Sequence, residues 1–238
     1  MSITDIANQR GYYNERWQQE GFANSLQAAR CAAVMSALSQ VGMKAPRILD
    51  MGCGTGWLAG IMGQFGPTTA VDLSEFAATT TAKSFPWVRF IQGDVFEWSK
   101  TQDTDFDVVV SQEVIEHVVD QAGYLEIAAR LLKDRGWLIL TTPNARTVRA
   151  LRNPQAWSNQ PIENIQTVGA LRRLVSRRFQ VVEVRTIVPN FGDRGIHRLL
   201  NSEKIGRLLD LAGVRSGYRR ALLRAGFGLH TVVLARKK

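Results

Sequence analysis

Ile48-Leu49-Asp50-Met51-Gly52-Cys53-Gly54-Thr55-Gly56 is the stretch of sequence that decides the fold. A short apolar run leads directly into three glycines at alternate positions, and helix-compatible residues follow. Glycine permits a positive φ and lets backbone lie close to a ligand, while a helix N-terminus attracts electronegative groups. The stretch is therefore interpreted as a ligand-binding turn, although a glycine-rich turn alone also suits a tight strand-to-helix connection.

Apolar runs alternate with helix-compatible stretches on both sides of this turn. Strands are predicted at 47–51, 69–73, 88–92, 106–111, 137–142, 180–188 and 229–235, and helices at 22–41, 57–65, 75–84, 118–133 and 166–177. Continuous apolar strands separated by helices are typical of a doubly wound parallel sheet that is buried on both faces. The predicted fold class is therefore α/β.

The chain of 238 residues is predicted to be a single domain with four parts. These parts are an N-terminal helical arm at 1–44, a core at 45–188, a basic helical cap at 189–228 and a final strand at 229–238. The cap has three candidate helical pieces near 195–201, 203–212 and 215–225 and is too long for a plain loop.

Composition excludes several classes of protein. The chain is 45% hydrophobic and 21% charged, which excludes intrinsic disorder as the main state. Two cysteines exclude a disulfide scaffold and a four-cysteine zinc site. The first 30 residues lack the pattern of a signal peptide, and no run of about 18 apolar residues occurs, so we expect a soluble, cytoplasmic protein.

Charge is distributed unevenly along the chain. Residues 1–145 hold 11 Lys and Arg against 16 Asp and Glu, a net charge of −5, whereas residues 146–238 carry +14. A cationic half attracts anions, such as nucleic acid, an acidic membrane surface or a phosphorylated substrate. The basic cap at 194–224 has eight cations, two acids and apolar residues at helical spacing. Such helices lie on a membrane, bind an acidic substrate, or cover the sheet with a solvated outer face.

Two carboxylates follow the next two predicted strands. Asp72 ends the second strand, 22 positions after Asp50, where a carboxylate can accept hydrogen bonds from both hydroxyls of a ribose. Gly93-Asp94-Val95 follows the third strand and offers a carboxylate and a backbone amide to an adenine edge. All three sites follow the carboxyl ends of strands, where ligands bind in open α/β sheets.

These motifs, in this order, resemble class I S-adenosylmethionine-dependent methyltransferases. The resemblance rests on D-x-G-x-G-x-G, V-D-L-S, G-D and F-D-V-V-V-S-Q-E-V-I-E-H-V, covers about 45–188 plus the final strand, and is closest to the ubiquinone-biosynthesis O-methyltransferase branch. It implies a seven-stranded Rossmann-like sheet, with an antiparallel last strand and N-terminal helices. S-adenosylmethionine is the implied cofactor. The glycine spacing also lacks the G-x-G-x-x-G of a pyrophosphate-binding turn.

The resemblance implies a role for each matching position. Gly52, Gly54 and Gly56 would line the methionine part of the cofactor, and Asp50 would hold the turn or the amino group. Asp72 would bind the ribose, Leu73 the adenine face, and Asp94 and Val95 the adenine amino edge. Further expected contacts are Gln112 at the methionine moiety and Cys53 as a small residue beneath the cofactor. Gly11–Trp17 would form an aromatic arm that closes over cofactor and acceptor, or would pack on the sheet edge.

The catalytic candidates are Glu113, Glu116 and His117, directly after the fourth strand. A histidine near neutral pKa suits removal of a proton from a hydroxyl acceptor. In related small-RNA 2′-O-methyltransferases a similar E-x-x-E-H block binds a divalent metal together with a histidine further along the chain. This sequence has no histidine between 118 and 196, and Glu163 is the residue that could replace it. A third interpretation is that Glu116 and His117 orient a helix start. No metal site is predicted, and His230 in the last strand is expected to be structural.

The resemblance implies methyl transfer to the hydroxyl of a small-molecule, sugar or lipid-linked acceptor, which the basic half suits if that acceptor is anionic. RNA methylation is an alternative because of the +14 half, but no aromatic-interleaved basic groove is evident. A non-catalytic cofactor-binding module is a third, against which the complete glycine turn, Asp72 and Asp94 argue. A peripheral membrane contact through the cap stays open, and the sequence indicates no oligomeric state.

Overall fold

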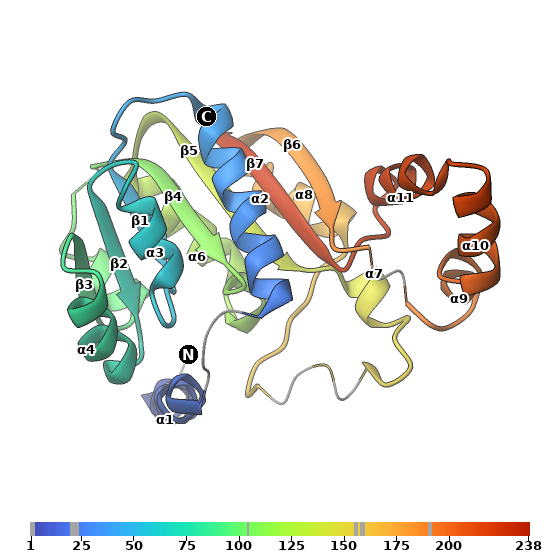
Figure 1. Ribbon diagram of the computed structural model, residues 1–238. Coiled ribbons are helices and arrows are strands. Elements are labelled where there is room, and N and C mark those ends of the chain that lie inside the picture. Colours follow the sequence, from blue (N-terminus) through green and yellow to red (C-terminus); the bar gives the residue numbers. More distant parts are fainter. Residues whose placement is uncertain (1–2, 20–23, 104, 155–156, 158–159, 190–191) are drawn as a thin grey trace.

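A single sheet organises the protein, whose computed structural model describes residues 3–19, 24–103, 105–154, 157, 160–189 and 192–238. Within these residues seven strands lie side by side, with helices on both faces (Figure 1). Their order is β3 (Val88–Gln92), β2 (Thr68–Asp72), β1 (Ile48–Met51), β4 (Phe106–Gln112), β5 (Leu132–Pro143), β7 (His230–Lys237) and β6 (Phe179–Ile187). Strands β1 to β5 pair in parallel, and β7 is antiparallel to β5 and β6. The predicted fold is confirmed.

Helices can cover both faces of the sheet because successive side chains of a strand point to opposite sides. The helices of the described residues are α1 (Ile3–Gln19), α2 (Ser25–Val41), α3 (Trp57–Met62), α4 (Glu75–Ser84), α5 (Val95–Ser99), the 3₁₀ turn η1 (Ile115–His117), α6 (Gln121–Leu131), α7 (Ala145–Val148), α8 (Val168–Val175), α9 (Ile196–Leu200), α10 (Glu203–Leu211) and α11 (Arg215–Arg224). Leu49 of β1 belongs to a buried cluster that includes residues of α6 and α8, whereas its neighbour Ile48 belongs to one that includes residues of α2 and α3. Both faces are therefore buried, as a doubly wound sheet requires.

Helix α2 confirms the helix predicted at 22–41 and shows how its ends are fixed. The side chain of Asn24 accepts hydrogen bonds from the backbone N–H groups of Leu26 and Gln27, and the side-chain oxygen of Gln27 accepts one from the backbone N–H of Asn24. This capping box satisfies donors that the first helical turn leaves free. The helix ends at Gly42, which has a φ of 68° and provides the predicted stop.

The helix predicted at 118–133 is shorter, and strand β5 is longer than predicted. Asp120 caps α6 by accepting from the backbone N–H of Gly123, so the helix begins at Gln121. It ends at Leu131 because Leu132 already pairs with Phe106 of β4. The sequence ARLL at 129–132 is compatible with a helix or a strand. Pairing with β4 makes its last residue part of a strand.

The basic segment between β6 and β7 forms the three predicted helices, α9, α10 and α11. The hydroxyl of Thr186 in β6 donates to the carbonyl oxygen of Leu223 and accepts from the N–H of Gly228 at 3.0 Å, which joins α11 to the sheet. Strand β6 runs in the direction of β5, so these helices leave the sheet at the edge where the glycine turn lies. No helix in the described residues is both long and apolar enough to span a bilayer.

Candidate active site

The glycine turn has backbone angles and close contacts that exclude other residues. Gly52 and Gly54 have φ values of 82° and 54°, in the left-handed region that favours glycine. A Cβ on Gly52 would lie 2.5 Å from Val114, and one on Gly54 would lie 2.9 Å from the Trp17 ring. Gly56 lines neither cavity of the site; with a φ of 70° it starts helix α3.

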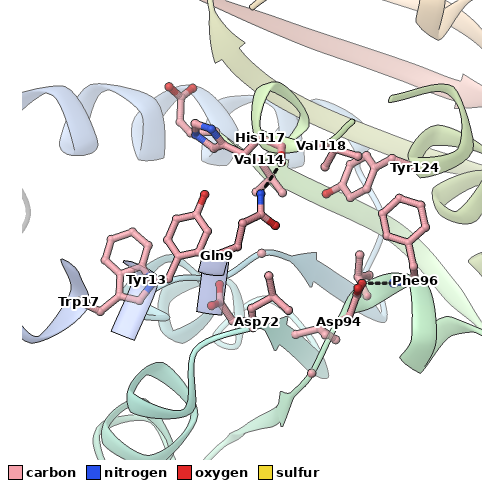
Figure 2. Close-up of a pocket in the computed structure, with 16 residues that line it drawn as sticks. Gln9, Tyr13, Trp17, Asp72, Asp94, Phe96, Val114, His117, Val118 and Tyr124 are labelled. Atoms are coloured by element: carbon pink, nitrogen blue, oxygen red, sulfur yellow. Dashed lines mark hydrogen bonds between the residues drawn. The ribbon is translucent and has the colours of Figure 1, made fainter. Parts of the chain in front are cut away.

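One cavity lies beside this turn at the carboxyl ends of β2 and β3 (Figure 2). The volume of this cavity is about 720 Å³, and the cavity is open to solvent. Five predicted cofactor residues line it, namely Gly52, Asp72, Leu73, Asp94 and Val95. The residues expected to bind the ribose and the adenine follow the carboxyl ends of neighbouring strands, and they therefore surround one cavity.

Backbone hydrogen bonds fix the two acids of this cavity. The carboxylate of Asp72 accepts from the N–H groups of Gly54 at 2.7 Å and Ser74 at 2.9 Å. Burial raises the pKa of Asp72, although these two N–H groups lower it in part. Asp94 accepts from the N–H of Phe96 at 2.8 Å and so starts helix α5. Both carboxylates keep further acceptor capacity, since each oxygen has two lone pairs.

A second cavity, of about 920 Å³, adjoins the first and shares Gly52, Glu113 and His117 with it. Predicted residues on its wall are Asp50, Cys53, Gly54 and Gln112. Asp50 is 1% exposed, and within the described part of the chain neither of its carboxylate oxygens has a hydrogen-bond partner. Gln112 Oε1 is likewise buried without a partner there. Buried acceptors of this kind are rare unless a ligand supplies the donor.

His117 lines both cavities and is held by its backbone and its ring. Gln9 of α1 donates to its carbonyl oxygen at 3.1 Å, as the dashed line in Figure 2 shows. Ring atom Nδ1 lies 2.8 Å from the carbonyl oxygen of Ile162. Because a carbonyl oxygen only accepts, Nδ1 carries the proton and the lone pair is on Nε2. Burial lowers the pKa of His117, which keeps the ring neutral near pH 7.

Glu113 and Glu116 share the second cavity with His117 but have opposite electrostatics. Burial and then the charge of Glu113 raise the pKa of Glu116 well above its usual range. Burial alone would raise the pKa of Glu113, but His230, Arg30 and Thr141 lower it overall. No group of three or more His, Cys, Asp or Glu among the described residues is placed to hold a metal ion.

The aromatic segment 11–17 is part of helix α1, not an arm that precedes the first helix. Gln9, Tyr13 and Trp17 are spaced four residues apart, so they share one helical face, and that face lines the first cavity. The rings of Tyr13 and Trp17 stack with centroids 6.1 Å apart (Figure 2). Asn14 accepts from the hydroxyl of Ser74 at 2.8 Å. Helix α1 therefore covers the site.

Two of the residues that sequence analysis missed contact Glu113. His230 was expected to be structural, but its Nδ1 lies 2.9 Å from Glu113 Oε2 and its ring lies 6.0 Å from that of Trp157. Arg30 of α2 lies 3.7 Å from the same carboxylate. Both come from elements far from residues 111–118 in sequence. The position of His230 was the feature of the sequence that could have indicated this contact. His230 begins β7, where it pairs with Pro143 at the end of β5.

A family model described as a methyltransferase domain matches residues 23–215. The chain belongs to this methyltransferase family. The ubiquinone biosynthesis O-methyltransferase of Xanthomonas campestris pv. campestris (strain B100) is 31% identical over 136 residues, 55% of this chain and 57% of that relative. The methyltransferase thus spans little more than half the length of this relative.

Two solved structures share the fold of this methyltransferase. N-methyltransferase NodS from Bradyrhizobium japonicum WM9, in complex with S-adenosyl-L-homocysteine, has a TM-score of 0.65 at 12% identity, covering 97% of this chain and 98% of that one. An S-adenosylmethionine-dependent methyltransferase from Mesorhizobium loti has a TM-score of 0.62 at 18% identity, covering 88% and 98%. The class I resemblance is confirmed, and S-adenosylmethionine is the cofactor.

The residues present fit this cofactor. Its amino group is a cationic donor, and the side chain of Asp50 is a buried acceptor without a hydrogen-bond partner among the described residues. Its ribose hydroxyls are donors for the spare acceptor positions of Asp72. We expect Asp50 and Gln112 to hold the methionine part, and Asp72, Leu73, Asp94 and Val95 the nucleoside part.

Asp50→Asn should stabilise the ligand-free protein at pH 8 while weakening cofactor binding. Burial, and then the charge of Asp72, raise the pKa of Asp50 from 3.8 to about 7. Between these values the folded protein keeps a proton that the unfolded chain releases, so stability falls as pH rises, by about 4 kcal/mol in total at 1.36 kcal/mol per unit.

Thermal unfolding at pH 5 and pH 8 measures this effect. We expect the gain in melting temperature of Asp50→Asn to be large at pH 8 and small at pH 5. A variant that is less stable at pH 8, or that binds S-adenosylhomocysteine with wild-type affinity, would contradict the role given to Asp50.

Proposed function

We propose that this methyltransferase methylates a hydroxyl oxygen of a small-molecule, sugar or lipid-linked acceptor held in the second cavity. The observation that carries the proposal is the position of His117, whose ring lines the wall common to both cavities. Its Nδ1 is committed to Ile162, and its pKa is lowered by burial. A neutral imidazole at this place suits a hydroxyl acceptor, which must lose a proton during transfer.

S-adenosylmethionine, when bound, supplies a methyl group on a positively charged sulfur. His117 Nε2 takes the proton of the acceptor hydroxyl as the oxygen becomes a nucleophile. Glu113, with its pKa lowered overall, stays ionised beside His230 and Arg30, so it adds negative charge near the positive reaction centre. Tyr13 and Trp17 shield the first cavity from water, and holding the two reactants together supplies much of the acceleration.

The wall of the second cavity supports an acceptor with a flat or ring-shaped body. Trp57 and Trp157 offer faces for an aromatic or sugar ring, and Arg16 and Arg30 attract a negative group. Gln160 also lines this cavity, where its side-chain oxygen accepts a hydrogen bond from the hydroxyl of Tyr13 at 2.9 Å. The similarity to ubiquinone biosynthesis O-methyltransferase supports an oxygen acceptor.

Incubation with methyl-labelled S-adenosylmethionine tests the proposal. The acceptor panel pairs each hydroxyl compound with its amine analogue, and product is identified by mass spectrometry. We expect label on oxygen, with demethylated cofactor formed in equal amount. Label that appears only on the amines, or only on RNA, would overturn oxygen transfer to a small acceptor. Cofactor binding without turnover on any member of the panel would favour a non-catalytic module.

A further inference from the structure

Helices α9 and α10 and the turn after α10 carry a group of exposed apolar side chains. These side chains are Ile196, Leu199, Ile205, Leu208, Leu211 and Val214. Leu208 is 68% exposed and Leu211 is 87% exposed, although leucine is among the residues most often buried. In Figure 1 these helices project beyond the β6 side of the sheet. We name residues 194–224 the cap surface.

The same surface is cationic. Its exposed cations Arg198, Lys204, Arg219, Arg220 and Arg224 have no acidic partner in the part of the chain that the structure describes. Both acids of the segment are already paired: Glu203 lies 3.7 Å from Arg207, and Asp210 pairs with Arg215. The cap surface therefore offers uncompensated positive charge.

On α10 one exposed cation and two exposed leucines share a helix face. Lys204, Leu208 and Leu211 are spaced four and three residues apart along α10 and are all exposed, so they lie on one side. Gly206 is the buried position of this helix, next to the side chain of Arg215. The side of α10 that packs on the protein is thus opposite the side that holds the leucines.

We propose that the cap surface docks on an anionic lipid membrane. An interfacial helix buries its apolar side chains at the boundary of the acyl chains while neighbouring cations meet negative headgroups. A second copy of the chain would bring the same cations face to face, which costs free energy. An RNA would pair with the cations but leave the leucines in water. Only a lipid surface satisfies both sets of side chains.

The cap surface is fixed to the site end of the sheet. Asn144, next to Pro143 of the second cavity, donates through its side chain to the carbonyl oxygens of Gly226 at 3.0 Å and Gly228 at 2.9 Å. The N–H of Asp193 donates to Ala150 beyond α7 at 2.7 Å. Docking would therefore place the substrate cavity near the lipid surface. The docking itself does not depend on which atom is methylated.

Vesicle sedimentation with the full chain tests the proposal. We expect binding to phosphatidylcholine vesicles that contain phosphatidylglycerol and none to pure phosphatidylcholine. Leu208→Glu/Leu211→Glu and Arg219→Gln/Arg220→Gln/Arg224→Gln should each weaken binding by about 100-fold. Phe65→Glu is the matched control: Phe65 is 49% exposed, outside the cap surface, and its replacement should leave vesicle binding unchanged. Melting temperature and affinity for S-adenosylhomocysteine should be those of the wild type in all three variants.

Several outcomes would overturn the inference. Failure of the wild-type protein to bind anionic vesicles would overturn it. Wild-type affinity of the double leucine variant for these vesicles would also overturn it. A dimer in analytical ultracentrifugation that the leucine variant breaks would assign the surface to a second copy. Salt-dependent RNA binding that needs the arginines and not the leucines would assign it to nucleic acid.

Discussion

His117→Ala should lower the turnover number by about 10²–10⁴-fold and leave the affinity for S-adenosylhomocysteine nearly unchanged. In the proposed mechanism the imidazole of His117 is the base between the two cavities, and without it the hydroxyl proton must pass to water. His197→Ala is the matched control, because His197 is also buried but lies in the cap surface, where its ring packs on that of Phe227. Steady-state kinetics and calorimetry on the two variants separate chemistry from binding.

The pH profile gives a second view of the same residue. Burial lowers the pKa of His117 from 6.5, so the base is already neutral at pH 7. We therefore expect kcat to rise with pH below 6.5 and to stay flat from pH 7 to 8. Turnover by His117→Ala at the wild-type rate would leave His117 with a structural role. Activity that vanishes with a chelator and returns with a divalent ion would instead support the metal interpretation.

Asp72→Ala should weaken binding of S-adenosylmethionine by at least about 100-fold. A carboxylate that serves two ribose hydroxyls makes two charge-assisted hydrogen bonds, each worth roughly 1.5–3 kcal/mol. The same carboxylate holds the N–H of Gly54, so its loss also frees the glycine turn. Isothermal titration calorimetry measures the affinity.

Two variants separate the ribose contact from a general effect of charge. Glu75→Ala removes an exposed acid three residues further along and should leave the affinity unchanged. Asp72→Asn keeps the shape of the side chain and should lie between the two. If Asp72→Ala binds as tightly as the wild type, Asp72 does not hold the ribose.

The fold and the grouping of residues around the first cavity could be predicted because they depend on local patterns. Alternating apolar strands and helices determine a doubly wound sheet, and the carboxyl ends of its parallel strands meet at one edge. Asp72 and Asp94 therefore come together with Gly52 even though they are separated in sequence. Helix α2 was predictable for a similar reason, since its cap and stop residues lie next to it in the chain.

The second cavity was harder to predict because packing between distant elements builds it. Arg30 comes from α2 and His230 from β7, and both reach Glu113 only through the register of the sheet and the position of α2 on its face. The early end of α6 has the same origin, because pairing of Leu132 with Phe106 is a contact across the sheet. Helix α1 differs from the prediction for another reason. Its aromatic residues suggested an arm, yet the spacing of four between Tyr13 and Trp17 suits a helix.

Titration of the wild-type chain with S-adenosylmethionine tests the central claim most directly. We expect saturable binding of one S-adenosylmethionine molecule per chain. The affinity should be at least about 100-fold lower in Asp72→Ala and unchanged in Glu75→Ala. Absence of binding by the wild-type protein would contradict the account of both cavities.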